Sequence, residues 1–155
     1  MGKELSIQSL RFAIKKTLQA KKNLVMTQVA INHGFDASSD RVYRVSLSTP
    51  LNYINNHLKI FSMLYVEQIV KKARSEQNSL DSFRLVINNL HRKQKEEKRD
   101  LKQTKKTSLE SKLISASLQI SLSFRSKLIK SLQEEYNKEK QDYITKQNKK
   151  FFSKK

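Results

Sequence analysis

The chain has 155 residues, a formal net charge of +18, a hydrophobic fraction of 37%, two glycines, one proline and no cysteine. So few helix breakers favour long helices over β-hairpins, and the lack of cysteine excludes disulfides and thiolate metal sites. A compact protein with this charge repels itself, so we expect a polyanionic partner, first of all nucleic acid.

The amino-terminal part of the chain is predicted to hold two helices. Apolar residues at helical spacing, from Leu10 to Leu18, predict a helix over 5–22 that ends at Asn23. Thr27 then has the hydroxyl of a helix N-cap, for a short helix over 28–33. Gly34 follows at the position where helices often end in a left-handed residue.

Two further helices are expected before residue 75. Asp36, Ser38 and Ser39 are N-cap candidates for a third helix that ends near Leu47. Ser48, Thr49 and Pro50 then predict a new helix with proline in its first turn, extending to about Arg74. Its buried face would comprise the apolar residues Leu51, Ile54, Leu58, Phe61 and Tyr65.

The second half of the chain is predicted to be helical and basic. Asn78 or Ser79 would cap a helix with Phe83, Ile87 and Leu90 on its buried face. Residues 91–108 fit a solvated helix or a flexible tether, because their charges alternate in sign. Residues 109–132 show both strand and helix periodicity, and helix is favoured because no turn residues lie nearby.

The expected fold is therefore all-α. Its divisions are an amino-terminal helical domain over 1–74, a long basic helical region over 75–145 that forms a bundle or coiled-coil arm, and a basic tail over 146–155.

Residues 27–47 have the pattern of a helix-turn-helix. Ala30 is small enough to face the second helix, Gly34 suits the turn, and Phe35 can fill the small core. Arginine at 41 and 44 can bind a guanine edge or phosphate oxygens through its planar guanidinium. An ordinary turn between two core helices explains the same spacing without a DNA-binding role.

Residues 25–54 resemble the helix-turn-helix of bacterial regulators of the AraC and TetR families, and of small accessory proteins of transposons and plasmids. Asp40 departs from the tightest form of that motif, which has an apolar residue six positions after the glycine; Val42 comes two positions late. The resemblance implies binding of duplex DNA.

The predicted interface has two parts. The DNA-binding residues are Thr27, Gln28, Ser38, Ser39, Arg41, Tyr43 and Arg44. Contacts to backbone phosphates are expected from Lys21, Lys22, Lys93, Lys95, Lys105 and Lys106.

No catalytic site is predicted. The only histidines are His33, His57 and His91, and no metal-binding, phosphate-loop or paired-carboxylate motif is present, so we expect no enzyme activity, metal, cofactor or small-molecule substrate. The chain also lacks an apolar segment of the roughly 18 residues that span a bilayer, and an apolar secretory signal. We expect an intracellular protein, in the cytoplasm if it is bacterial.

The first hypothesis is a non-enzymatic protein that binds double-stranded DNA, as a regulator or as an accessory subunit of a recombination or replication machine. A homodimer or a larger protein partner would fit this role. The alternative is a helical subunit of an RNA- or guide-RNA-containing complex, in which lysines line a backbone groove. Association with anionic membranes through a basic amphipathic helix is a third and less favoured option.

Overall fold

The computed structural model describes the backbone of residues 5–34, 37–104 and 108–153, and the side chains of these residues outside 34–47 and 152–153. Four helices make up the fold: α1 (Ile7–Gly34), α2 (Ala37–Ser75), α3 (Ser79–Gln103) and α4 (Leu109–Ser153). None of the described residues lies in a strand, so the prediction of an all-α protein is confirmed.

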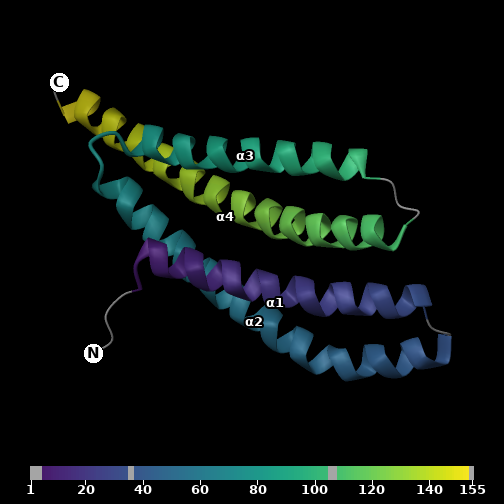
Figure 1. The fold of residues 1–155 in the computed structure, drawn as a ribbon. Coiled ribbons are helices and arrows are strands. Elements are labelled where there is room, and N and C mark those ends of the chain that lie inside the picture. Colours follow the sequence, from purple (N-terminus) through teal and green to yellow (C-terminus); the bar gives the residue numbers. More distant parts are fainter. Residues whose placement is uncertain (1–4, 35–36, 105–107, 154–155) are drawn as a thin grey trace.

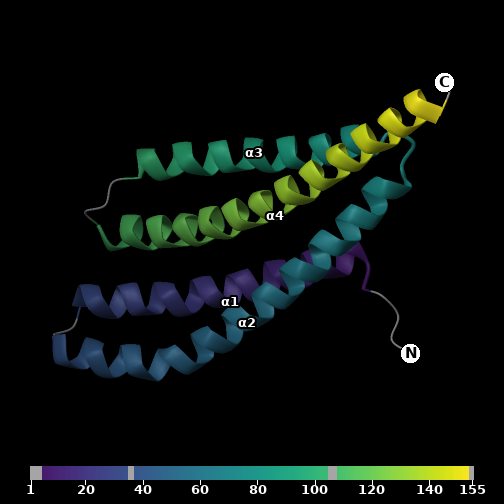
Figure 2. The same ribbon diagram turned by 180° about the vertical axis from the view of Figure 1, so that it is seen from behind.

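The helices form two hairpins. Helices α1 and α2 form one hairpin, α3 and α4 form the other, and the two meet mainly through α1 and α4 (Figure 1). The hairpins diverge away from the α2–α3 turn, and the carboxy-terminal end of α4 extends beyond the other helices (Figure 2). The α2–α3 turn follows Ser75, and the predicted domain boundary after residue 74 stays a prediction.

Helix α1 is continuous through the point where two helices were predicted. Asn23 does not end a helix, because α1 continues to Gly34. Its side-chain oxygen accepts a hydrogen bond from Gln19 Nε2 at 2.9 Å on the surface of this helix. Thr27 is not an N-cap, because its hydroxyl donates to the Asn23 carbonyl at 2.8 Å. A Thr hydroxyl can bond the carbonyl four residues earlier inside a helix, so a residue typical of caps need not mark an end.

Helix α2 is likewise continuous where the predicted helices ended and began. It has 39 residues and contains Pro50 in its interior rather than in its first turn. Proline has no N–H and crowds the preceding turn, so Pro50 is a physical cause for bending. Helix α2 is curved in both ribbon views (Figures 1 and 2).

For the second half of the chain, the predicted helices agree better with the structure. Asn78 caps α3, and its side chain accepts a hydrogen bond from the Asp81 N–H. The helix continues through the charged stretch to Gln103, so of the two alternatives the solvated helix is correct over 91–103. Residues 109–132 are helical, and α4 continues to Ser153, so most of the predicted basic tail is part of this helix.

The hydrophobic core joins all four helices. Leu10 of α1, Phe83 of α3 and Leu132 of α4 are fully buried, and Ile69 and Ala73 of α2 pack in the same cluster. The core therefore combines residues that precede the α2–α3 turn in the chain with residues that follow it. No helix in the described part of the chain has an apolar stretch long enough to cross a membrane.

Each hairpin is also joined by an arginine–tyrosine pair. Arg11 Nε donates to the Tyr65 hydroxyl at 3.2 Å between α1 and α2, and Arg84 Nε donates to the Tyr136 hydroxyl at 2.8 Å between α3 and α4. In both pairs the guanidinium lies over the tyrosine ring, at 5.9 and 5.7 Å from its centroid. Such contacts supply a polar link at the edge of a hydrophobic helix interface.

Candidate nucleic-acid interface

The structure does not confirm the predicted helix-turn-helix. Thr27 and Gln28 lie within α1, and the predicted helix over 36–47 is part of α2 where it is described. Gly34 is the last residue of α1, and no glycine among the described residues has a positive φ, so the left-handed position predicted there is wrong. Phe35 and Asp36 lie outside the described residues.

The remaining predicted DNA-binding residues lie near the start of α2. Ser38, Ser39, Arg41, Tyr43 and Arg44 are in its first part, but their side chains lie outside the described set. Their predicted role therefore stays a prediction.

A row of basic residues lies on the outer face of α3. Arg92, Lys95, Arg99 and Lys102 are spaced three, four and three residues apart, which places them on one face of a helix with 3.6 residues per turn. All four side chains are exposed. We call this row the α3 basic ridge.

The ridge has no acidic partner in the described part of the chain, where none of its four residues forms an ion pair. One nearby carboxylate, Glu97, instead points to the other helix of the hairpin and pairs there with Arg125 of α4. Gln94 also points to α4 and donates to Ser126 Oγ at 2.6 Å. These inward contacts fix the rotation of α3, so that the ridge faces outward.

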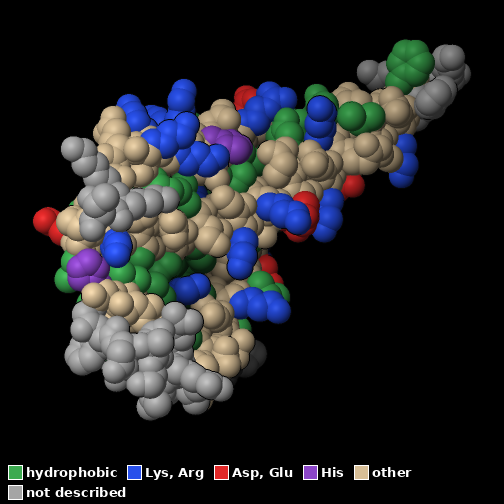
Figure 3. All heavy atoms as spheres, turned by 90° about the vertical axis from the view of Figure 1, so that its right-hand side faces the viewer, with side chains coloured by type: hydrophobic (Ala, Val, Ile, Leu, Met, Phe, Trp, Pro, Cys, Tyr) green, Lys and Arg blue, Asp and Glu red, His purple; other side chains and the backbone are tan. Residues whose placement is uncertain are grey.

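The space-filling view shows the result. Lysine and arginine side chains gather along the top of the molecule, over α3 (Figure 3). Four cations within about 15 Å, at 1.5 Å of rise per residue, form a surface that matches a line of phosphates better than a single small anion.

The predicted phosphate contacts are divided among different surfaces. Lys93 and Lys95 are exposed on α3, and Lys95 belongs to the ridge. Lys22 is half-buried on α1, away from α3 in sequence and in the fold. Lys105 and Lys106 lie outside the described residues. The structure thus brings together only part of the set.

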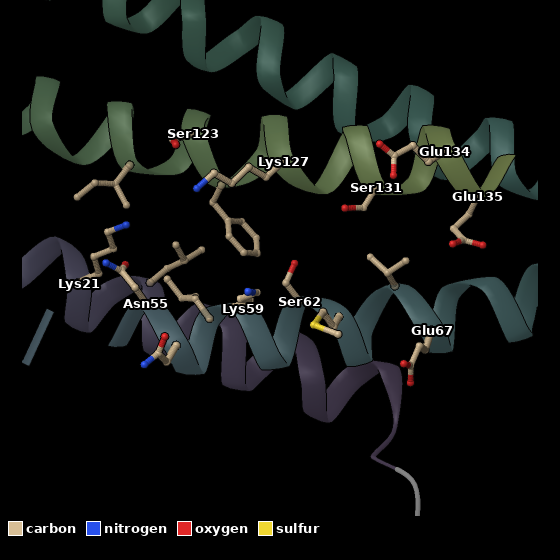
Figure 4. A pocket seen from close by; sticks show the side chains of 17 residues that line it. Lys21, Asn55, Lys59, Ser62, Glu67, Ser123, Lys127, Ser131, Glu134 and Glu135 are labelled. Carbon is tan, nitrogen blue, oxygen red and sulfur yellow. The ribbon is translucent and has the colours of Figure 1, made fainter. Parts of the chain in front are cut away.

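Lys21 lies on a different surface from Lys93 and Lys95. It is half-buried and faces a groove of about 750 Å³ between α2 and α4, which extends from Lys21 and Asn55 at one end to Glu67 and Glu135 at the other (Figure 4). We call this the α2–α4 groove. Burial and the positive charge of Lys127 lower the pKa of Lys21.

Sequence reasoning missed three of the four ridge residues, Arg92, Arg99 and Lys102. Their spacing is visible in the sequence, but it defines a helix face only if the stretch is helical, and the charge pattern of residues 91–108 also fits a tether. The groove lysines at 59 and 127 were also missed, and nothing in the sequence alone brings them together, because they lie on different helices far apart in the chain.

The fold and this surface define a basic, all-α protein built from two long helical hairpins. Comparison with known protein families, with curated proteins and with solved structures finds no match to the chain. Among the described residues, no three histidine or acidic side chains are grouped as metal ligands.

Proposed function

We propose that this protein binds double-stranded DNA without catalysing a reaction, and that it does so through phosphate contacts from the α3 basic ridge. The observation that carries the proposal is the outward row of four cations without acidic partners in the described part of the chain. The net charge of +18 adds long-range attraction to any nucleic acid.

The binding mode differs from the one predicted from sequence. An exposed ridge of arginine and lysine on a straight helix suits contact with the DNA backbone, which positions a protein without reading bases. A role as regulator, or as accessory subunit of a recombination or replication machine, would then depend on protein partners for its specificity.

The test compares two variants with the same loss of charge. The ridge variant carries Arg92→Gln, Lys95→Gln, Arg99→Gln and Lys102→Gln. The control variant neutralises four exposed lysines spread over the other helices, namely Lys15, Lys72, Lys130 and Lys149. Duplex affinity is measured over a salt series by fluorescence anisotropy.

We expect the ridge variant to lose more affinity than the control. The slope of log affinity against log salt should become shallower by up to about 3.6, since each phosphate contact contributes about 0.9 for B-DNA. An equal loss in both variants would mean that net charge alone drives binding, and the ridge assignment would be wrong. Preference for RNA over duplex DNA in the same series would instead favour the RNA-complex alternative.

A second comparison tests the helix-turn-helix directly. Arg41→Ala with Arg44→Ala should lower the affinity for all duplexes by the same factor, because the short helices that the motif requires are parts of α1 and α2. If the variant instead lost affinity only for one preferred duplex sequence, this would support contacts of these arginines with base edges.

A further inference from the structure

Lysines from three helices line the α2–α4 groove, and two of them form a positively charged end. Lys21 of α1, Lys59 of α2 and Lys127 of α4 all line the groove. Figure 4 shows Lys21 and Lys127 extending toward the same end of the groove, with Asn55 and Ser123 beside them. In the described part of the chain no carboxylate pairs with any of these three lysines.

This grouping has an electrostatic cost that an anion would remove. Burial, and after it the positive charge of Lys127, lowers the pKa of Lys21. A bound anion between them would replace repulsion by charge-assisted hydrogen bonds, which are the stronger class of hydrogen bond. The cationic end is therefore suited to a phosphate or carboxylate.

The middle of the groove is open and partly apolar. Phe124 and Val66 line it, together with Met63, whose side chain is 57% exposed. A methionine this exposed presents adaptable apolar surface to water. A ligand that covers these residues would gain hydrophobic stabilisation as well as the charge contacts.

The far end of the groove has the opposite charge. Glu67 of α2 and Glu134 and Glu135 of α4 lie there, away from the lysines (Figure 4). Between Asn55 and Glu67 the groove follows α2 for about 18 Å, at 1.5 Å per residue. An anionic head is attracted to one end and repelled from the other, so a bound ligand would have a single orientation.

We propose that the α2–α4 groove binds a single-chain anionic amphiphile. Its phosphate or carboxylate head is held by Lys21 and Lys127, and its apolar chain lies along Phe124, Met63 and Val66. A volume of about 750 Å³ is within the range of small-molecule sites, roughly 300–1,000 Å³. The site uses none of the ridge residues, so it is independent of the proposed DNA binding.

The experiment uses the full chain and dodecyl phosphate, kept below its micelle-forming concentration. Calorimetry gives the stoichiometry, and ¹³C-methyl labelling of methionine gives the location, because Met63 lines the groove and Met26 does not. We expect one molecule per chain and a shift of the Met63 methyl signal without a comparable shift of Met26. Inorganic phosphate and neutral dodecyl maltoside should each bind at least about tenfold more weakly, since each lacks one of the two contacts.

Matched variants test the residues. Lys21→Gln with Lys127→Gln should weaken dodecyl phosphate binding by about tenfold or more, the effect of losing charge-assisted hydrogen bonds. The control is Lys15→Gln with Lys130→Gln, exposed lysines of the same two helices that do not line the groove. Met63→Gln should weaken binding several-fold, and Leu85→Gln, at a position 64% exposed on α3, should not.

Several outcomes would overturn the proposal. Equal losses in the groove and control lysine pairs would show attraction to net charge only. Inorganic phosphate binding as tightly as dodecyl phosphate would show an anion site without an apolar subsite, and shifts of equal size at Met26 and Met63 would show unspecific coating. Laurate, which carries a carboxylate, then shows whether the groove accepts either head group or phosphate alone. Weak binding of both laurate and dodecyl phosphate would contradict the proposal.

Discussion

At the scale of single residues, the same side chain can end a helix or support its interior. Thr27 and Asn78 both belong to residue types that favour N-caps, yet only Asn78 caps a helix. What differs is the backbone group available to each oxygen. Asn78 meets the free Asp81 N–H, whereas the Thr27 hydroxyl meets a carbonyl within α1.

This difference makes a prediction about stability. Thr27→Ala should raise the free energy of unfolding by up to about 0.5 kcal/mol, because alanine is the better residue inside an exposed helix. Asn78→Ala, the matched change at the real cap, should lower it by about 1 kcal/mol. Urea denaturation followed by circular dichroism measures both. A loss of about 1 kcal/mol for Thr27→Ala would indicate that a helix does begin there.

At the scale of helices, the periodic spacing of apolar residues predicted the buried faces better than capping and helix-breaking residues predicted the helix ends. The apolar stripes around Leu10, Leu58 and Phe83 identified core positions correctly. The lack of turn residues near 109–132 predicted a helix there, and the structure confirms it. The predicted ends at Asn23 and Leu47 were wrong, because tertiary packing along a long hairpin outweighs weak local breaking tendencies. The spacing of the α3 basic ridge lies in the sequence, but its outward orientation follows from the contacts that Glu97 and Gln94 make with α4. The grouping of the groove lysines could not be predicted, because they come together only once the helices pack.

Pro50 provides a test at this scale. In a helix interior, proline is unfavourable by up to about 3 kcal/mol, partly offset by the smaller entropy of the unfolded chain. Pro50→Ala should therefore raise the free energy of unfolding by about 1–2 kcal/mol.

The control for Pro50 is Asn52→Ala, at an exposed position of the same helix, which should gain no more than about 0.6 kcal/mol. Thermal and urea denaturation of the two variants would separate a backbone effect from a change in side-chain helix propensity. A loss of stability in Pro50→Ala would instead support a helix that starts at this proline.

At the scale of the whole molecule, charge opposes compactness. The described ion pairs, among them Arg74 with Glu139 and Arg125 with Glu97, connect helices. They cannot reduce the net charge of +18, because it is the excess that remains after all acidic residues are counted. The two hairpins therefore pack together against a general repulsion, which nucleic acid or salt would relieve.

Stability should consequently increase with salt. From about 0.05 to about 0.5 M sodium chloride, the range of charge–charge interactions shrinks, and the free energy of unfolding in urea should rise. The ridge variant, which carries four fewer positive charges, should show a smaller rise. A flat or falling salt dependence would mean that the ion pairs between helices outweigh the repulsion.

The pairing of neighbouring helices into hairpins also bears on the kinetics of folding. Contacts within α1–α2 and within α3–α4 join segments that are adjacent in the chain, and short loops close at small entropic cost. The contact between α1 and α4 joins segments near the two ends of the chain, so most of the loop-closure entropy belongs to that one interface. Changes at Leu10 or Leu132, the fully buried residues of these two helices, are therefore the place to look for control of the folding rate.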